Sequence, residues 1–221
     1  MTEHAAHIAG KAVSKARVDA VLEAIPARDR EMRPEAFARA ERQRRRWATQ
    51  VVVTDELAQQ ACAQRGLRGA GLYQSAAPPR GATSHNEPAA DRQPTTALSA
   101  ELGSIVATAL AHSPAARTLL TALEHEQLVP DEAAWEYYTR NRDRYLTRDA
   151  LRRGVNPFDG AADADFVPYE QARGSITAEL RRAAGRHAFF DWLDQARASV
   201  TYAPGHEHPG DPSHPDHEHR H

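Results

Sequence analysis

Apolar residues recur at the three- and four-residue spacing of α-helices along most of the chain. One such run follows Ser14, a predicted N-cap, and ends at Pro26; its apolar positions are Val18, Val21, Leu22 and Ile25. A second helix is predicted from about Pro34 to Gln64, with a break near Thr54 and with Gly66 as its C-cap. The first third of the chain is therefore predicted to be helical.

The second half of the chain shows the same helical spacing. Ser113 and Pro114 supply the N-cap and the first residue of one helix. Asp131 and Glu132 open another, because acidic side chains favour the positive end of a helix. The longest helix is predicted from about Pro168 to Ala198; its apolar face carries Ile176, Leu180, Ala183, His187 and Phe190.

Short segments at the two ends of the chain favour extended structure instead. Ile8 to Val13 is predicted to be a strand or an extended turn around Gly10, and "ASVTYAP" near the C-terminus has β-character. Pairing of these two segments would join the chain ends. The sequence therefore predicts a mainly α fold with a small strand pair. The expected parts are N-terminal strand and helices (1–68), a flexible Gly/Pro/Ser-rich linker (69–95), a helical remainder of the same module (96–201) and an extended tail (202–221).

The bulk composition limits the classes of partner. Among 221 residues the formal net charge is −2, which argues against a protein that coats nucleic acid. The Arg-rich stretch from Ala38 to Trp47 is accordingly interpreted as a solvated helix face rather than an RNA or phosphate site. Cys62 is the only cysteine, so no internal disulfide forms. No apolar run approaches a membrane span or a secretory signal, so we expect a soluble cytoplasmic protein.

The known catalytic motifs do not occur in a usable context. The chain has no Walker A loop, no G-x-S-x-G elbow and no C-x-x-C pair. His217–His221 matches H-E-x-x-H, but that motif holds zinc only on a helix, and here it closes a Pro-broken tail. We therefore predict that the chain is not an enzyme and requires no cofactor.

Aromatic residues of the predicted helix after Pro130 are candidates for binding a protein client. Trp135, Tyr138 and Tyr145 have the size and polar handles of interface anchors. The same residues would serve equally well as the core and rim of a small domain. Both interpretations stay open at the level of the sequence.

Six of the twelve histidines lie in the last sixteen residues, between acidic residues and prolines. Imidazole with carboxylate suits Ni or Zn, and the candidate ligands are His206, His208, His214, His217, His219 and His221. Pro209, Pro212 and Pro215 favour an extended polyproline II form that spreads these side chains along the tail. Three interpretations therefore compete: a metal site, a docking segment for a partner, and no specific role.

Three stretches, in chain order, resemble the chaperone module of SurA/PrsA-type foldases. They are "IAGKAVSKARVDAVLEA", "WATQVVVTDELAQQACAQRGL" and "LVPDEAAWEYYTRNRDRYL". After the third stretch that family inserts a parvulin isomerase domain of about a hundred residues. Here only about twenty residues separate Leu146 from Phe166, too few for an independent domain. The resemblance covers about two thirds of the chain and implies a SurA N-terminal-like module that lacks its catalytic part.

These features lead to two functional expectations. The preferred one is a non-catalytic chaperone-like or assembly factor that holds protein clients. The alternative is a metal-handling accessory or scaffold protein for a metalloenzyme such as a hydrogenase, which uses the histidine-rich tail. Expected partners are a protein client, a partner enzyme or a second copy of the chain, with neither nucleic acid nor a membrane span involved.

Overall fold

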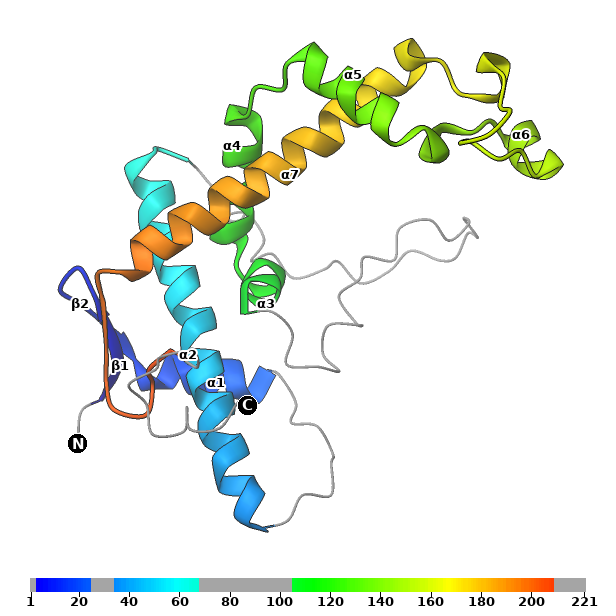
Figure 1. Cartoon of the computed structure of the whole chain (residues 1–221). Coiled ribbons are helices and arrows are strands. Elements are labelled where there is room, and N and C mark those ends of the chain that lie inside the picture. Colours follow the sequence, from blue (N-terminus) through cyan, green and yellow to red (C-terminus); the bar gives the residue numbers. More distant parts are fainter. Residues whose placement is uncertain (1–2, 25–33, 68–104, 209–221) are drawn as a thin grey trace, which may run out of the picture. The chain divides into compact units, whose positions relative to one another are not determined.

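The computed structural model of the chain describes residues 3–24, 34–67 and 105–208 (Figure 1). The chain divides into two compact units: unit 1 comprises Met1–Leu119 and Trp192–His221, and unit 2 comprises Leu120–Asp191. Helices account for most of the described residues, and one small antiparallel sheet completes them, which confirms the predicted mainly α fold. The predicted linker (69–95) lies outside the described residues.

The described residues of unit 1 form the sheet, three complete helices and the ends of two others. Its elements are β1 (His4–Ile8), β2 (Lys11–Ser14), α1 (Lys15–Ala24), α2 (Pro34–Gln64), α3 (Ile105–His112) and β3 (Val200–Tyr202). Helices α4 (Pro114–Glu126) and α7 (Tyr169–Arg197) contribute residues to both units. As predicted, Ser113 caps α4: its hydroxyl oxygen accepts a hydrogen bond from the Ala116 amide at 2.9 Å.

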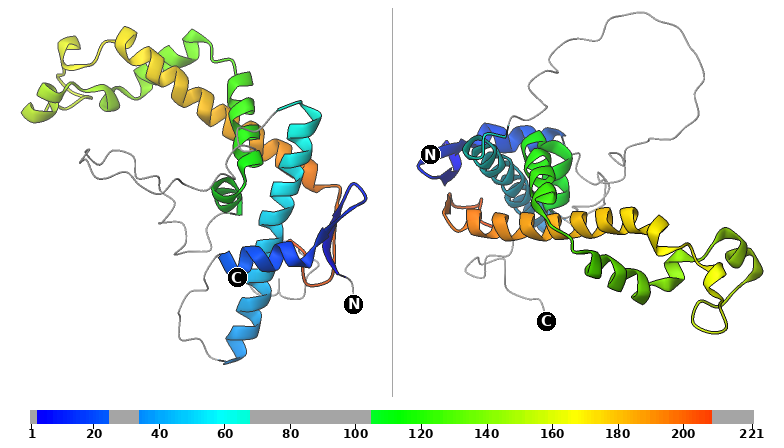
Figure 2. Two further views of the ribbon diagram at one scale, coloured as in Figure 1. Left: turned by 180° about the vertical axis from the view of Figure 1, so that it is seen from behind. Right: turned by 90° about the horizontal axis from the view of Figure 1, so that it is seen from above.

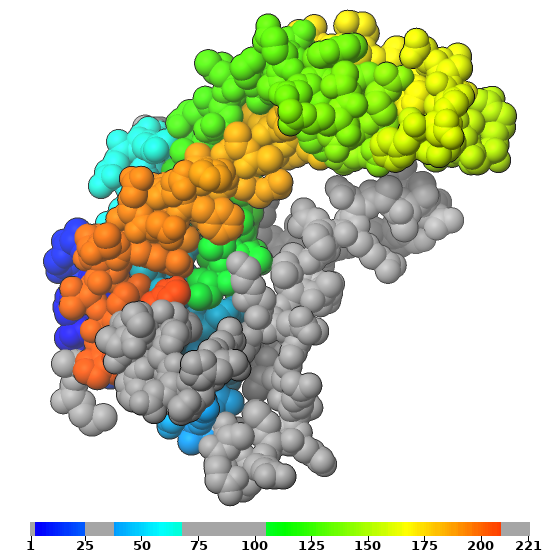
Figure 3. Space-filling view, in the orientation of Figure 1, coloured from blue at the N-terminus to red at the C-terminus, as the bar shows by residue number. Residues whose placement is uncertain are grey.

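The sheet brings the two ends of the described chain together. Strands β1 and β2 form a hairpin whose two turn residues, Ala9 and Gly10, have φ values of 48° and 82°, as a type I′ turn requires. Strand β3 pairs antiparallel with the other edge of β1, with Ile8 opposite Val200. Figure 3 shows this proximity as orange atoms of the C-terminal segment beside blue atoms of the hairpin. The predicted pairing of the N- and C-terminal segments is thereby confirmed.

Helix α2 is the central element of unit 1, and α1 packs across it (Figure 2). The predicted break near Thr54 is wrong, because the Thr54 hydroxyl donates to the Gln50 carbonyl at 2.8 Å and leaves the helix continuous. The helix ends as predicted at Gly66, whose φ is 64°, and the Leu67 amide closes a Schellman motif on the Cys62 carbonyl at 2.8 Å. Its buried apolar residues are Trp47, Ala48, Val51, Val52, Val53, Leu57, Ala58, Ala61 and Cys62.

Helix α2 also carries a buried carboxylate. The side chain of Glu56 is 3% exposed; it accepts a hydrogen bond from Lys11 Nζ at 2.5 Å and one from Arg17 Nη1 at 2.7 Å. Burial raises the pKa of this carboxyl, but the hydrogen bonds from Lys11 and Arg17 outweigh it and leave the pKa below its ordinary value. Since Lys11 belongs to β2 and Arg17 to α1, one carboxylate fixes both elements on α2.

Unit 2 is built around α5 (Asp131–Arg140) and the first part of α7, which pack together (Figure 1). Its other elements are η1 (Arg142–Tyr145), α6 (Arg148–Arg153) and η2 (Asp163–Asp165). A buried cluster forms its core and consists of Ala134, Tyr138, Ala172 and Ile176. Nearby, α4 and α7 approach so closely that a Cβ at Gly185 would stand 2.6 Å from Glu124 Cα.

Replacing the buried carboxylate should weaken unit 1 in a pH-dependent way. We expect Glu56→Gln to lower the free energy of unfolding by about 2 kcal/mol at pH 7, because hydrogen bonds to a charged group are lost. The folded pKa of Glu56 lies below its unfolded value, so the carboxylate stabilises above about pH 4.5 and that stabilisation disappears as the pH falls further. Urea unfolding of the variant and the wild type at pH 7 and pH 3 measures the difference in their free energies of unfolding at each pH. The exposed Glu23→Gln serves as control, and an equal effect of both variants at pH 7 would contradict the assignment.

Two glycines of α7 should respond in opposite directions to alanine. We expect Gly185→Ala to destabilise by about 1–3 kcal/mol, because the new methyl group overlaps the backbone of Glu124. Gly174→Ala meets nothing within 4 Å and should stabilise by about 0.5–1 kcal/mol through helix propensity. Thermal unfolding followed by circular dichroism compares them; stabilisation by both substitutions would show that the helices do not approach at Gly185.

Candidate functional site

The segment between α5 and α7 is closed at its base by paired backbone. Leu146 and Phe166 form an antiparallel bridge. On either side of it, the Val167 amide donates to the Tyr145 carbonyl at 2.7 Å and the Thr147 amide donates to the Asp165 carbonyl at 2.8 Å. Residues 147–165 therefore form a segment of unit 2 whose two ends meet at one point.

Local capping orders this segment. Thr147 caps α6 by accepting from the Ala150 amide at 3.2 Å, and Gly154, with φ 68°, ends α6 in a left-handed conformation. The Asn156 side chain accepts from the Phe158 amide at 3.1 Å. Asp165 accepts from the Ala162 amide at 2.9 Å and also pairs with Arg153. The segment is thus held by its own polar groups rather than by an apolar core.

Two large apolar side chains on this segment face solvent. Leu151 on α6 is 60% exposed, and Phe158 in the following turn is 78% exposed. Among the described residues, every large hydrophobic side chain found exposed belongs to unit 2; the others are Leu128, Trp135 and Phe190. A single exposed apolar residue is ordinary, and all five of these lie in unit 2.

The aromatic residues predicted to bind a client form one cluster. Tyr138 lies at its centre, with ring centroids 5.8 Å from Trp135 and 5.0 Å from Tyr145. Tyr138 itself is buried, and its hydroxyl donates to the Val167 carbonyl at 2.7 Å. Trp135 is half-exposed and packs edge-on against Tyr169 at 4.9 Å, whereas Tyr145 is partly buried. Of the three predicted residues, Trp135 therefore has the most accessible ring.

Charged side chains contact the aromatic cluster and its neighbours. The Arg142 guanidinium stacks over the Phe166 ring at 3.9 Å from its centroid, and it also lies 5.5 Å from the centroid of Tyr138. Tyr137 donates to Glu179 at 2.8 Å, and Arg144 forms an ion pair with the same carboxylate at 3.0 Å. Burial raises the pKa of the Tyr145 hydroxyl. These contacts hold the aromatic cluster in place beneath the half-exposed ring of Trp135.

Sequence reasoning did not identify the exposed residues Leu128, Leu151, Phe158 and Phe190. A signal for Phe158 does exist, since it stands between Pro157 and the Asp159–Gly160 pair, where a turn places side chains toward solvent. Leu151 had no comparable signal, because its exposure depends on which face of α6 meets the rest of unit 2.

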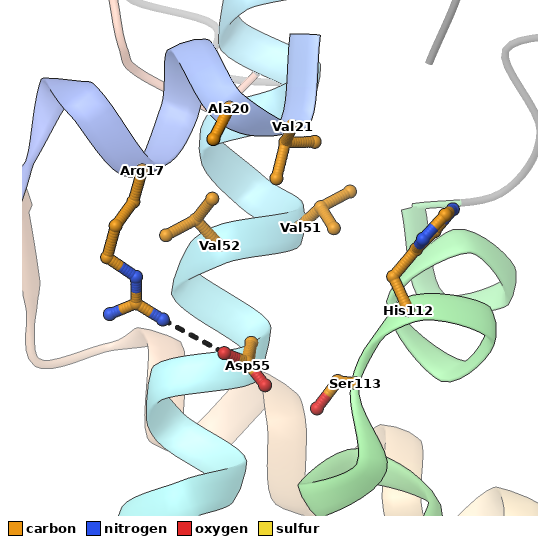
Figure 4. A pocket seen from close by; sticks show the side chains of 8 residues that line it. All are labelled: Arg17, Ala20, Val21, Val51, Val52, Asp55, His112 and Ser113. Carbon is orange, nitrogen blue, oxygen red and sulfur yellow. Dashed lines mark hydrogen bonds and ion pairs between the residues drawn. The ribbon is translucent and has the colours of Figure 1, made fainter. Parts of the chain in front are cut away.

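Unit 1 contains a cavity of about 240 Å³ between α1, α2 and the end of α3 (Figure 4). Its lining residues are Arg17, Ala20, Val21, Val51, Val52, Asp55, His112 and Ser113. The Arg17 side chain donates to Asp55 at 2.9 Å, and the Ser113 hydroxyl already serves as the cap of α4. With these polar groups engaged, the cavity offers mainly apolar space of the size of one aliphatic or aromatic side chain.

The first two histidines of the tail occupy different surroundings from those of a metal site. His206 is 4% exposed, and its Nδ1 lies 2.8 Å from the Thr49 hydroxyl. Arg46 then donates to the Glu207 carbonyl at 3.0 Å and to the His208 carbonyl at 2.5 Å. Burial lowers the pKa of His206, with the nearby cations Lys15 and Arg45 acting in the same direction.

The metal-binding prediction for the tail stays a prediction. Within residues 3–24, 34–67 and 105–208, no group of three His, Cys, Asp or Glu side chains is placed to hold an ion. His206 directs one ring nitrogen to Thr49, whereas His214, His217, His219 and His221 lie outside the described residues. Cys62 is buried, its thiol contacts the Ala115 carbonyl at 3.4 Å, and burial raises its pKa.

Comparisons with known protein families, with curated proteins and with solved structures find no match. In the part of the chain that the structure describes, no helix is both long and apolar enough to cross a membrane.

The burial of His206 should make the C-terminal contact sensitive to acid. The folded pKa of His206 lies below the ordinary 6.5, so the folded protein favours the neutral ring. The stability that the neutral ring contributes is complete above pH 6.5 and is lost as the pH falls below that value. Asp19 and Glu207 oppose this trend without reversing it. We expect unfolding between pH 7.5 and 5.5 to show a smaller loss of stability in His206→Gln than in the wild type. The exposed His125→Gln should behave like the wild type, and equal losses in all three proteins would contradict the assignment.

Proposed function

We propose that the protein is a non-catalytic chaperone-like or assembly factor that holds apolar segments of protein clients on unit 2. The observation that carries the proposal is the exposure of Leu151 and Phe158 on a segment ordered by its own hydrogen bonds. Such a segment presents apolar surface without needing that surface for its own stability. The half-exposed ring of Trp135 adds a further apolar contact within the same unit.

Holding by these residues would be weak and reversible. Full burial of one Leu or Phe side chain contributes about 1.5–3 kcal/mol. Two such contacts, reduced by the entropy lost on association, give an affinity suited to transient capture rather than to a permanent complex. Release then needs no cofactor, because competition from the client's own folding is sufficient.

The position of the segment supports the proposal. The chain order of motifs resembles SurA/PrsA-type chaperone modules, and Leu146 and Phe166 pair at the point where those foldases carry their isomerase domain. In this chain the short ordered segment stands in that place. A module of this kind would keep the client-holding role of the family and lack its catalysis.

Removing the exposed apolar groups should weaken client binding without unfolding the protein. We expect the double variant Leu151→Ser/Phe158→Ser to bind a permanently unfolded client about 10- to 100-fold more weakly, because apolar contacts worth a few kcal/mol are lost. Fluorescence anisotropy with a reduced, alkylated client measures binding, and light scattering measures the suppression of aggregation. The melting temperature should change little, since both side chains face solvent.

The matched control is Leu151→Met/Phe158→Leu, which keeps the apolar character and should keep binding. Unchanged binding by the serine variant would remove unit 2 as the client surface. Robust acceleration of prolyl isomerisation in a peptide by the purified wild-type chain would overturn the non-catalytic part of the proposal.

A further inference from the structure

The cavity of unit 1 is lined by two helices that both pack on α2. Helices α1 and α3 each contact α2, and the lining residues come from these three helices and from Ser113, which follows α3 (Figure 4). The walls are mainly apolar: Ala20 and Val21 belong to α1, and Val51 and Val52 belong to α2. Apolar walls hold water poorly, because a buried water needs about two to four polar partners. The cavity therefore suits an apolar molecule better than it suits solvent.

The volume of the cavity fits a single six-membered ring with a substituent. A protein cavity of about 150 Å³ lined by aliphatic and aromatic side chains is large enough to bind benzene. At about 240 Å³ the cavity of unit 1 leaves room for one further group on such a ring. Drug-sized ligands occupy larger spaces, which begin at about 300 Å³. The volume thus limits the ligand to a small molecule.

Two polar groups of the cavity keep hydrogen-bonding capacity. Asp55 Oδ2 accepts from Arg17 Nη2 at 2.9 Å and from Gln59 Nε2 at 2.7 Å, whereas Asp55 Oδ1 accepts no hydrogen bond from the described residues. Ser113 is 2% exposed; its oxygen accepts from the Ala116 amide, and its hydroxyl proton has no acceptor in the described part of the chain. Figure 4 shows the Ser113 hydroxyl turned toward Asp55. The two side chains offer a ligand one acceptor and one donor.

The charges beside the cavity already balance one another. Arg17 pairs with both Asp55 and Glu56, and Lys11 also pairs with Glu56, so that two cations face two carboxylates. A charged ligand would bring an uncompensated charge into mainly apolar surroundings, which is costly. These surroundings favour an uncharged ligand.

We propose that this cavity binds a small neutral ring compound with one hydroxyl group, the class to which phenol belongs. The ring packs on the four apolar walls, while its hydroxyl group donates to Asp55 Oδ1 and accepts from the Ser113 hydroxyl. Because the lining comes from three helices, the bound ring joins α1 and α3 to α2, and binding stabilises unit 1 by mass action. The site is separate from the client surface proposed on unit 2, so neither proposal depends on the other.

Titration of the full-length protein with phenol, followed by methyl NMR resonances, tests the site. We expect saturable shifts of the Val21, Val51 and Val52 methyl groups, with a dissociation constant of about 1 mM or below for a ligand of this size. Ala20→Leu should weaken binding at least about 10-fold, because the larger side chain fills the cavity. The matched control is Ala16→Leu, which lies one turn earlier on α1 outside the lining and should leave binding unchanged.

Both alanines are exposed, so neither substitution disturbs the core. Shifts confined to another surface, no saturation by about 20 mM phenol, or equal weakening by the two leucine variants would each overturn the proposed site.

A comparison of ligands tests the chemistry. Fluorobenzene keeps the ring without the hydroxyl group and should bind about 10-fold more weakly than phenol, because a hydrogen bond to a carboxylate is lost. Benzoate and benzylammonium carry a charge and should bind more weakly still. In Asp55→Ala, phenol binding should fall to the level of fluorobenzene, whose own binding should persist. Equal binding of phenol and fluorobenzene by the wild type, tighter binding of a charged compound, or loss of both neutral ligands in Asp55→Ala would contradict the assignment.

N-acetyltyrosinamide distinguishes a free ring compound from a tyrosine side chain of another protein. It carries the same phenol group on a peptide backbone that exceeds the volume of the cavity, so we expect it to bind at least several-fold more weakly than phenol. Binding as tight as that of phenol would show that the cavity accepts a protein side chain, and the proposal of a small-molecule site would be wrong.

Discussion

Each polar side chain that a helix carries into a protein core needs a hydrogen-bonding partner there. This constraint governs how the other elements of unit 1 pack on α2. Its buried polar residues are Arg46, Thr49, Gln50, Thr54 and Glu56. Their partners come from both ends of the chain: Lys11 and Arg17 from the first 20 residues, and residues 197–208 from the last. A buried polar group that loses its partner costs about 1–3 kcal/mol, so the sheet, α1 and the C-terminal segment hold their places on α2 together.

Local signals determined most of what the sequence predicted correctly. Caps such as Ser113 and Gly66 act within one helical turn, and a short apolar segment near each terminus suffices to suggest the sheet. The main omission depended on a contact distant in sequence, since the burial of His206 follows from its contact with Thr49, 157 positions away. The predicted break at Thr54 failed for a local reason, because the Thr54 hydroxyl bonds to the Gln50 carbonyl one turn earlier. The sequence offered His206 as a candidate ligand, and the structure shows one of its ring nitrogens beside the Thr49 hydroxyl of α2.

The client-binding prediction illustrates the same limit at the candidate site. Aromatic size pointed to Trp135, Tyr138 and Tyr145, and the structure does bring them into one cluster. However, composition cannot decide which member of such a cluster faces inward. In the structure, Tyr138 is the buried member. The exposed large apolar side chains of the connecting segment, Leu151 and Phe158, were not predicted, because neither belongs to a recurring pattern. Their accessibility results from how residues 147–165 are folded back by capping and by the bridge at their base.

That bridge has a consequence for how the chain tolerates change. Leu146 and Phe166 hold the two ends of residues 147–165 side by side, so the length of the chain between them has little influence on unit 2. Closing a longer connection costs only about 0.6 kcal/mol for each doubling of its length, because loop-closure entropy grows slowly. A folded domain whose own termini lie close together can therefore be joined between these two residues while the helices beneath keep their packing. The bridge makes this segment a natural position for gaining or losing a whole domain.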